Sequence, residues 1–472
     1  MKKPLNKGGA TLQPDLCVVG TGPAGLSLAA AGALLGVSVV LVGEPSRAEE
    51  RGLSAATLRA AADRAHALRT AFDLGIGRER AEPEIDWAGL HSHMRHVVAR
   101  DAPMAALDRY RAMGVHVIHE TAHFADPATL LAGSTTIRAR RFVLAPEGRP
   151  DLPAIPGLET VPYLTEDSVL DLAALPRDLL ILGAESEAVW LAQTYRRLGS
   201  RVTVIAPEER LLKREDPEMV AIVDRSLRRE GIDFRLGSDV EFEEGADGGI
   251  VARFSHGEVH PEASHLVLAS GRSPVFDGLN LAAAKIRTGP EGLELDHHLR
   301  TTNPKVYAVD HTLPLATQQA GFAFRNAVLR LPTRFDPTAV PRLVHGAPEM
   351  ASVGLTEAQA RERSTPICVL RAPFADNSRA IADRATEGHI KVVTTPTGKI
   401  LGCSIVGARA HDLVAPWALA MANGLAVSDL AGVALSGPAY SDVGRSAALE
   451  YLKLSAQAPW LRRALGFVRR WG

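Results

Sequence analysis

Cysteine is scarce in this chain of 472 residues, which contains only Cys17, Cys368 and Cys403. No two of them are close enough in the sequence to form a C-x-x-C or a C-x4-C motif. Their number and spacing argue against a disulfide scaffold, a cysteine-based zinc site and a local redox dithiol. Cys17 lies in an apolar segment, where we expect it to act as a small buried hydrophobic residue.

An excess of charge is also missing, because 53 basic residues oppose 54 acidic ones and the formal net charge is −1. The bulk chain therefore gives no indication of nucleic-acid binding. The basic start, residues 1–15, is not followed directly by an apolar run, which argues against a signal peptide. The most apolar stretch, residues 26–42, is interrupted by glycines and is typical of a helix followed by a strand. We expect a cytoplasmic protein of about two to four domains.

A complete glycine turn, GTGPAG, occupies residues 20–25 between an apolar strand and an Ala-rich helix. The G-x-G-x-x-G spacing allows a tight turn, the close approach of a pyrophosphate and close helix–strand packing, while the helix N-terminus faces the phosphates. Glu44 follows the second strand and is the candidate for holding ribose hydroxyls, with an ordinary loop carboxylate as the alternative reading. The predicted dinucleotide-binding residues of this turn are Gly20, Gly22, Pro23, Ala24 and Gly25.

A second βαβ unit starts near Asp178 and makes an internal repeat with the first. Its turn, GAESEA at 183–188, carries Glu185 in place of the second glycine and Ala188 in place of the third. A like-charge pair about 4 Å apart costs about 4 kcal/mol at an intermediate effective dielectric. That cost corresponds to roughly a thousandfold in affinity. Ala206 also stands where a ribose-binding acid is expected, so we predict weak or absent NAD(P)H binding in the usual mode.

Further motifs lie downstream: LASGRSP at 268–274, LRTTNPKVYAVD at 299–310, and a long C-terminal stretch that includes FADNSRAIADRATEGHIKVV at 374–393. Together with the first glycine turn, they resemble the pyridine nucleotide–disulfide oxidoreductases, the family of dihydrolipoamide dehydrogenase and mercuric reductase. The resemblance covers nearly the whole chain. It implies FAD in the first site, NAD(P)H in the second, and a homodimer.

The resemblance also implies the fold: an α/β chain with two Rossmann-like dinucleotide-binding domains and a C-terminal α+β dimerisation domain. We expect the FAD-binding domain to be discontinuous, with the NAD(P)-binding-like domain inserted into it. The expected ranges are 1–152 and 272–336 for the FAD-binding domain, 153–271 for the NAD(P)-binding-like domain, 337–455 for the dimerisation domain, and 456–472 for a basic amphipathic tail.

The chain departs from the family where the family's chemistry is located. The family's C-x4-C motif, followed by P-S-K, falls on residues 43–63, which are shortened and free of cysteine. Gly52 aligns with the second cysteine and Ala56 with the lysine. The family's H-P-T-x-x-E motif falls on SGPAYSD at 436–442, where Gly437 replaces the proton-carrying histidine. We therefore expect no dithiol chemistry, assign no catalytic residue and predict no metal site.

Positions that would face the flavin are altered as well. Trp190 replaces the glutamate that the family's lysine contacts, so both partners of that ion pair are lost together. Two readings of Trp190 stay open: it stacks near a flavin, or it fills the space. The family's A-T-G-S-R-P turn becomes APEGRP at 145–150, with Glu147 at a usually small position. Asp310 keeps the place of the ribityl-binding acid, on a shortened segment that needs a rearranged backbone.

The C-terminal residues 458–472 place tryptophan and aliphatic residues near helical spacing, with arginines largely on the other side. A short basic helix of this kind suits an anionic membrane surface, and packing on the partner subunit is the alternative. Membrane contact would place the protein peripherally on the inner face of the membrane.

Two functions remain in balance. The first is an FAD-dependent flavoprotein without disulfide chemistry, which passes electrons to a quinone or another small acceptor. The second is a catalytically silent homodimer, a pseudoenzyme that acts as a binding or scaffold protein. The intact first glycine turn favours the first function, and the parallel loss of cysteines, proton carrier and second glycine turn favours the second.

Overall fold

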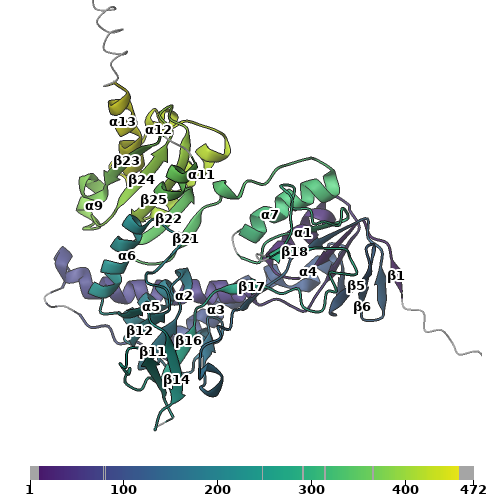
Figure 1. Ribbon diagram of the computed structural model, residues 1–472, viewed down its shortest axis with the longest axis horizontal. Coiled ribbons are helices and arrows are strands. Elements are labelled where there is room, and N and C mark those ends of the chain that lie inside the picture. The colour runs from purple at the N-terminus through teal and green to yellow at the C-terminus, as the bar shows by residue number, and fades with distance from the viewer. Residues whose placement is uncertain are drawn as a thin grey trace, which may run out of the picture. The chain divides into compact units, whose positions relative to one another are not determined.

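The structure is a computed structural model that describes residues 10–77, 79, 81–246, 248–289, 292–312, 315–363 and 366–456. Its chain divides into two compact units, whose elements are labelled in Figure 1. Unit 1 comprises Met1–Leu152, Asp167–Ala174 and Gly271–Phe335, and unit 2 comprises Pro153–Glu166, Leu175–Ser270 and Asp336–Gly472. Helices and parallel strands alternate in both units, which confirms the α/β fold class expected from the sequence.

Unit 1 is built on a five-stranded parallel sheet in the order β20-β8-β2-β3-β4. The central strands are apolar except for Arg141 at the start of β8, as expected for parallel strands that are buried on both faces. Cys17 in β2 is fully buried, in agreement with the expectation from its apolar surroundings. The strands are β2 (Leu16–Val19), β3 (Val39–Val42), β4 (His116–Ile118), β8 (Arg141–Leu144) and β20 (Val306–Ala308).

Helix α1 (Pro23–Leu34) follows β2 and packs on this sheet beside α7 (Leu315–Phe324), as Figure 1 shows. Gly22 is its N-cap and Pro23 occupies the first turn, where its missing N–H costs nothing. The helix stops just before Gly36, whose φ of +70° is left-handed. The strand, glycine turn, helix and strand predicted for residues 15–44 are therefore confirmed.

A second sheet of unit 1 has four strands in the order β1-β7-β6-β5. Phe124, Leu130 and Ile137 on this sheet are fully buried, and they share a core with Phe142 of the parallel sheet. The strands are β1 (Thr11–Leu12), β5 (Ala122–Asp126), β6 (Thr129–Ala132) and β7 (Thr135–Ile137). Short pairs complete the unit: β9 (Gly148–Pro150) with β17 (Arg272–Pro274), and β18 (Thr288–Gly289) with β19 (Gly292–Leu293).

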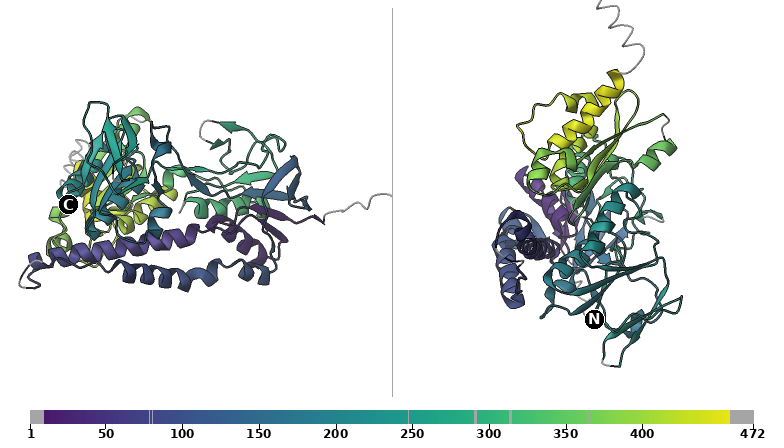
Figure 2. Two further views of the ribbon diagram at one scale, coloured as in Figure 1. Left: turned by 90° about the horizontal axis from the view of Figure 1, so that it is seen from below. Right: turned by 90° about the vertical axis from the view of Figure 1, so that its left-hand side faces the viewer.

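Two long helices of unit 1 lie side by side, as the left view of Figure 2 shows. They are α2 (Ala48–Thr70), which continues into η1 (Ala71–Leu74), and α3 (Trp87–Ala105), which is followed by α4 (Leu107–Ala112). Helix α2 begins at Ala48. Its first turn contains Glu49 and Glu50, and negative charge there is favoured by the helix dipole.

The first half of unit 2 repeats the βαβ architecture around a five-stranded parallel sheet in the order β10-β16-β11-β12-β13. Helix α5 (Ser186–Leu198) joins β11 to β12, and α6 (Pro217–Arg229) joins β12 to β13. The sheet strands are β10 (Leu164–Thr165), β11 (Asp178–Leu182), β12 (Arg201–Ala206), β13 (Asp233–Leu236) and β16 (His265–Leu268), with the hairpin β14 (Val240–Glu244) and β15 (Ile250–Phe254) beside them.

The first glycines of the two βαβ turns are confined in the same way. A Cβ on Gly20 would lie 1.9 Å from the Ala145 carbonyl oxygen, and one on Gly183 would lie 2.0 Å from that of Ala269. Their φ angles, +121° and +146°, also favour glycine. The internal repeat read from the sequence is therefore a repeat of backbone geometry.

The rest of unit 2 is an antiparallel sheet in the order β21-β22-β25-β24-β23, covered by short helices and by α13 (Asp442–Ala456). In the right view of Figure 2, α13 runs alongside these strands. The strands are β21 (Arg342–Val344), β22 (Glu349–Gly354), β23 (Cys368–Pro373), β24 (His389–Thr394) and β25 (Ile400–Gly407). The helices are α8 (Glu357–Arg363), α9 (Ser378–Ala382), α10 (Ala410–Leu413), α11 (Ala415–Ala422) and α12 (Val427–Ala431).

Membrane contact was expected only at the C-terminal end. Within the ranges given above, no helix is long and apolar enough to cross a membrane. The basic tail, residues 458–472, lies outside the described residues, and so its helix stays a prediction.

A buried charge cluster joins the two halves of unit 2. The Lys391 ammonium on β24 lies 2.9 Å from Asp216, 2.8 Å from Glu218 and 2.7 Å from Glu357. The side chains of Lys391 and Asp216 are only 4% and 5% exposed. Charges so deeply buried are tolerated only when they are paired. Lys391 therefore fixes the start of α6 to the antiparallel sheet.

Replacing Lys391 with methionine should destabilise unit 2, because three carboxylates would lose their shared cation. We expect a loss of about 3–5 kcal/mol in the free energy of unfolding, measured by chemical denaturation. Lys399→Met, at an exposed position of the same hairpin, should change it by less than about 0.5 kcal/mol. Equal effects of the two substitutions would contradict a structural role for the cluster.

Candidate functional site

The glycine turn of unit 1 forms a cradle in which the three glycines have different roles. Gly20 and Gly25 cannot carry side chains, because a Cβ on Gly25 would lie 1.9 Å from the Gly20 carbonyl oxygen and Gly20 itself meets Ala145. Around Gly22, by contrast, the nearest atoms to an added Cβ are 3.7 Å away. Gly22 is also the N-cap of α1, where free N–H groups attract anions. It is therefore the glycine that a phosphate can approach.

Three of the predicted binding residues follow the carboxyl ends of strands of one sheet. Gly20 follows β2, Glu44 follows β3 and Asp310 follows β20. Ligands of open α/β sheets bind at this edge. Pro23 and Ala24 form the first turn of α1, so the structure brings the predicted residues to one edge of one sheet.

Glu44 and Asp310 make local contacts in the structure. The Glu44 backbone oxygen accepts a hydrogen bond from the Thr21 hydroxyl, while its side chain is exposed. Asp310 Oδ1 accepts hydrogen bonds from the Thr312 N–H at 2.8 Å and from the Thr312 hydroxyl at 2.7 Å. The roles of both residues toward a ribose or ribityl group stay predictions.

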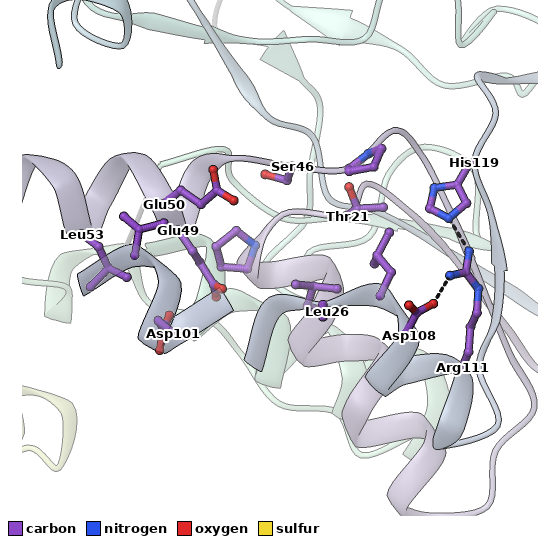
Figure 3. Close-up of a pocket in the computed structure, with 15 residues that line it drawn as sticks. Thr21, Leu26, Ser46, Glu49, Glu50, Leu53, Asp101, Asp108, Arg111 and His119 are labelled. Carbon is purple, nitrogen blue, oxygen red and sulfur yellow. Dashed lines mark hydrogen bonds and ion pairs between the residues drawn. The ribbon is translucent and has the colours of Figure 1, made fainter. Parts of the chain in front are cut away.

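A cavity of about 330 Å³ opens beside the cradle, within unit 1 (Figure 3). This volume lies at the small end of the range for ligand pockets, about 300–1,000 Å³, and suits a nucleoside-sized group. Its walls are apolar side chains from α1 to α4, with carboxylates at the rim. The lining residues are Thr21, Pro23, Leu26, Pro45, Ser46, Glu49, Glu50, Leu53, Val98, Asp101, Ala106, Leu107, Asp108, Arg111 and His119.

The charged lining residues form two groups. In Figure 3 the Glu49 side chain points toward Asp101. Burial, and then the charge of Asp101, raise the pKa of the Glu49 carboxyl above its usual value. At the other end Arg111 donates to the Asp108 carboxylate at 2.5 Å and also to His119 Nε2. Arg111 is thus already neutralised, and the carboxylates provide acceptors for hydroxyl or amino groups.

A cluster of ion pairs that the sequence did not reveal lies where α2 begins. Arg51 contacts Asp167 at 3.0 Å and Glu147 at 3.7 Å. Arg272 binds both oxygens of Asp167 at 3.1 Å and donates to the Gly148 carbonyl at 2.6 Å. Arg51 directly precedes Gly52, the position that aligns with the family's second cysteine. Glu147 stood out in the sequence, but nothing there linked it to Arg51 or Asp167.

The second glycine turn, in unit 2, carries a carboxylate at the start of a helix. Glu185 is the N-cap of α5 and is half-buried. Burial raises the pKa of its carboxyl, and the charge of Arg214 opposes this rise. The Leu212 N–H donates to the Ala184 carbonyl at 2.8 Å, so the segment after β12 lies against the turn. Glu185 thus occupies the helix start at which a pyrophosphate is expected.

Two of the three cysteines, and the residues at the family's proton-carrier and glutamate positions, have the following surroundings. Cys17 and Cys403 are buried, and burial raises the pKa of both thiols, which keeps them protonated and unreactive. Gly437 lies in an exposed loop, and Trp190 is buried on α5. Among the residues that the structure describes, no group of three or more His, Cys, Asp or Glu side chains could hold a metal ion.

Comparison with known proteins gives consistent matches along the chain. Residues 14–323 match the family described as pyridine nucleotide-disulphide oxidoreductase, and residues 340–448 match the dimerisation domain of that family. A mercuric reductase of Streptomyces lividans is 32% identical over 443 residues, covering 88% of this chain and 92% of that protein. A dihydrolipoyl dehydrogenase of Thermus scotoductus is 31% identical over 435 residues, covering 88% and 92%.

Solved structures with the same fold were also found. The HOCl-induced flavoprotein disulfide reductase RclA from Escherichia coli has a TM-score of 0.79 at 23% identity, covering 92% of this chain and 99% of that chain. LpdA from Mycobacterium tuberculosis has a TM-score of 0.82 at 23% identity, covering 93% and 99%. At this level of identity, the likeness establishes the fold.

Proposed function

This chain belongs to the pyridine nucleotide-disulphide oxidoreductase family, and we propose that it is an FAD-binding flavoprotein that works without dithiol chemistry. The observation that carries the proposal is the cradle of unit 1. Gly20 and Gly25 are packed against carbonyl oxygens, and Gly22 leaves room at the N-terminus of α1. The family is FAD-dependent, and this geometry fits the phosphates of a dinucleotide.

The residues of unit 1 supply the rest of a dinucleotide site. The turn from Gly20 to Gly25 would hold the pyrophosphate, and the adjoining cavity, with its apolar walls and rim carboxylates, would take the adenosine end. Glu44 and Asp310 remain the candidates for hydroxyl contacts. When bound, FAD supplies an isoalloxazine ring that accepts and releases electrons, while the protein positions it and limits its access to water.

Two features support a reaction that does not pass through a disulfide. At the start of α2, Gly52 stands where the family resemblance places the second redox cysteine, and no cysteine is near in the sequence. Gly437, at the position of the family's proton-carrying histidine, cannot transfer a proton. Electrons would therefore pass from the flavin directly to an acceptor such as a quinone or another small molecule.

The source of the electrons is the second part of the proposal. Glu185 at the N-cap of α5 opposes a pyrophosphate by its charge and by its side chain. We therefore propose that NAD(P)H binds poorly in unit 2 and that another reductant serves the flavin.

A second candidate function is a catalytically silent homodimeric scaffold. The specific observation in its favour is the ion-pair cluster of Arg51, Glu147, Asp167 and Arg272, which brings fixed charges to the flavin side of the cradle. The match of residues 340–448 to a dimerisation domain supports a homodimer under either function. We retain a cytoplasmic location for both candidates.

Reductive titration of the purified protein tests the main proposal. We expect a yellow protein whose flavin is bleached by a single electron pair from dithionite, because no dithiol is present to take a second pair. NADH should bleach it slowly or not at all. A colourless protein that takes up no FAD on reconstitution would favour the scaffold, and the uptake of two electron pairs would contradict the absence of dithiol chemistry.

Replacing Glu185 with glycine should increase the affinity of unit 2 for NAD⁺, by at most about a thousandfold. Glu185→Gln keeps the side chain and separates steric from electrostatic effects. Because burial raises the pKa of Glu185, lowering the pH should protonate it and tighten binding to the wild type. The glycine variant should lack that pH response. Unchanged affinity in Glu185→Gly, measured by calorimetry, would refute this explanation.

Membrane contact by residues 458–472 is a further proposal, motivated by their basic, tryptophan-containing pattern. Sedimentation with anionic liposomes should retain the full chain and release a chain that ends at Leu454. Equal sedimentation of the two chains would leave packing on the partner subunit as the reading of the tail.

A further inference from the structure

A carboxylate of unit 1 lies against the one glycine of the cradle that faces a ligand. A Cβ on Gly22 would lie 3.7 Å from Glu147 Cγ and 3.8 Å from Glu147 Oε1. Gly22 is the N-cap of α1, and the partial positive charge of a helix N-terminus attracts a carboxylate as it attracts a phosphate. Glu147 thus lies in the field that would bind the pyrophosphate.

The Glu147 side chain is held loosely, while its backbone is fixed. The Glu147 carbonyl accepts a hydrogen bond from the Val275 N–H at 2.9 Å, which anchors the turn between β8 and β9. The side chain itself is 34% exposed, and its contact with Arg51 measures 3.7 Å. It can therefore rotate into solvent without movement of the backbone.

Arg51 is fixed from the opposite side. Its Nε lies 3.0 Å from Asp167 Oδ1, and Asp167 is in turn gripped by both terminal nitrogens of Arg272 at 3.1 Å. A guanidinium has five donors in a planar fork, so the Asp167 contact leaves the Nη2 edge directed at Glu147. Arg51 is thus a preorganised cation, and the Glu147 carboxylate lies between it and Gly22, where a phosphate would bind.

We infer that the Glu147 carboxylate competes with the phosphates of the dinucleotide for the cation of Arg51. On binding, the pyrophosphate displaces the Glu147 carboxylate from Gly22 and takes the free edge of the Arg51 fork, while Asp167 keeps Arg51 in place. A pyrophosphate prevails because it carries more negative charge and more acceptor oxygens than one carboxylate. This inference rests on the proposed dinucleotide site and adds two residues that set its affinity.

The two glycine turns of the chain then differ in kind. Glu147 reaches the first turn from a neighbouring strand end and can leave it. Glu185 is part of the second turn and is half-buried at the helix start, so it cannot leave without moving the turn. Nucleotide binding at the first turn is regulated by the Glu147 side chain, which can rotate away. Nucleotide binding at the second turn is obstructed by Glu185, which stays in place.

Calorimetric titration of the full chain with ADP and with FAD tests this inference. Glu147→Gln keeps the shape and removes the charge, and it should tighten binding of both ligands by about tenfold. Arg51→Ala should weaken both by about tenfold or more, and Arg51→Lys should lie in between because it keeps the charge and loses the fork. A thermal melt will show whether Arg51→Ala unfolds because it loses the Asp167 contact. In that event the affinity of Arg51→Lys, which keeps the charge, tests the inference.

Matched control variants each remove one charge of the same sign as Arg51 or Glu147 from a nearby ion pair. Arg47 pairs with Glu50 at 3.1 Å at the start of the same helix, and Asp277 pairs with Arg149 at 2.8 Å. Arg47→Ala and Asp277→Asn should each change the affinity by less than about twofold. If Glu147→Gln binds no tighter than Asp277→Asn, or both Arg51 variants bind as well as Arg47→Ala, the inference is overturned.

The outcomes also separate this inference from the proposed function. If the wild type binds FAD and the Arg51 and Glu147 variants bind like their controls, the flavoprotein proposal stands and the competitor falls. If only Glu147→Gln binds ADP or FAD, the competitor is supported and the wild type is not a flavoprotein. If neither the wild type nor Glu147→Gln binds either ligand, both ideas fail.

Discussion

Negative charge at a helix N-terminus is the constraint on which the proposed function of this protein depends. Each unit has a parallel sheet in which a strand leads through a glycine turn into a helix, and each such turn attracts an anion. In this chain a carboxylate reaches both turns: Glu147 lies beside Gly22, and Glu185 caps α5. Under the functions proposed for the two turns, nucleotide binding is a competition between the phosphates and these two carboxylates.

The cradle of unit 1 keeps its shape because the surrounding backbone leaves no room for side chains at two of its glycines. At Gly20 and Gly25 a side chain would collide with carbonyl oxygens. Such contacts preserve the turn whether or not a ligand binds, so an intact G-x-G-x-x-G is evidence about folding as well as about binding. A Cβ at Gly22 would make only ordinary contacts, with Glu147 and Ser46 at 3.7 Å, so packing does not require glycine there, and Gly22 is the part of the motif that indicates a ligand.

The proposal that this chain works without dithiol chemistry rests on several positions that would act together. The thiols that remain are far apart in the sequence and two of them are buried, while Gly437 stands in place of a proton carrier. Around the start of α2, ion pairs lie at the position that the family resemblance assigns to a dithiol, and Arg51 is central to them.

The sequence by itself determined the α/β fold, the two βαβ turns and the burial of Cys17, because these depend on residues close together in the chain. Only the tertiary structure decided that Arg51, Glu147 and Asp167 meet at the cradle. Their contacts depend on the order of the strands and the path of the turns that follow them, and no local pattern encodes either.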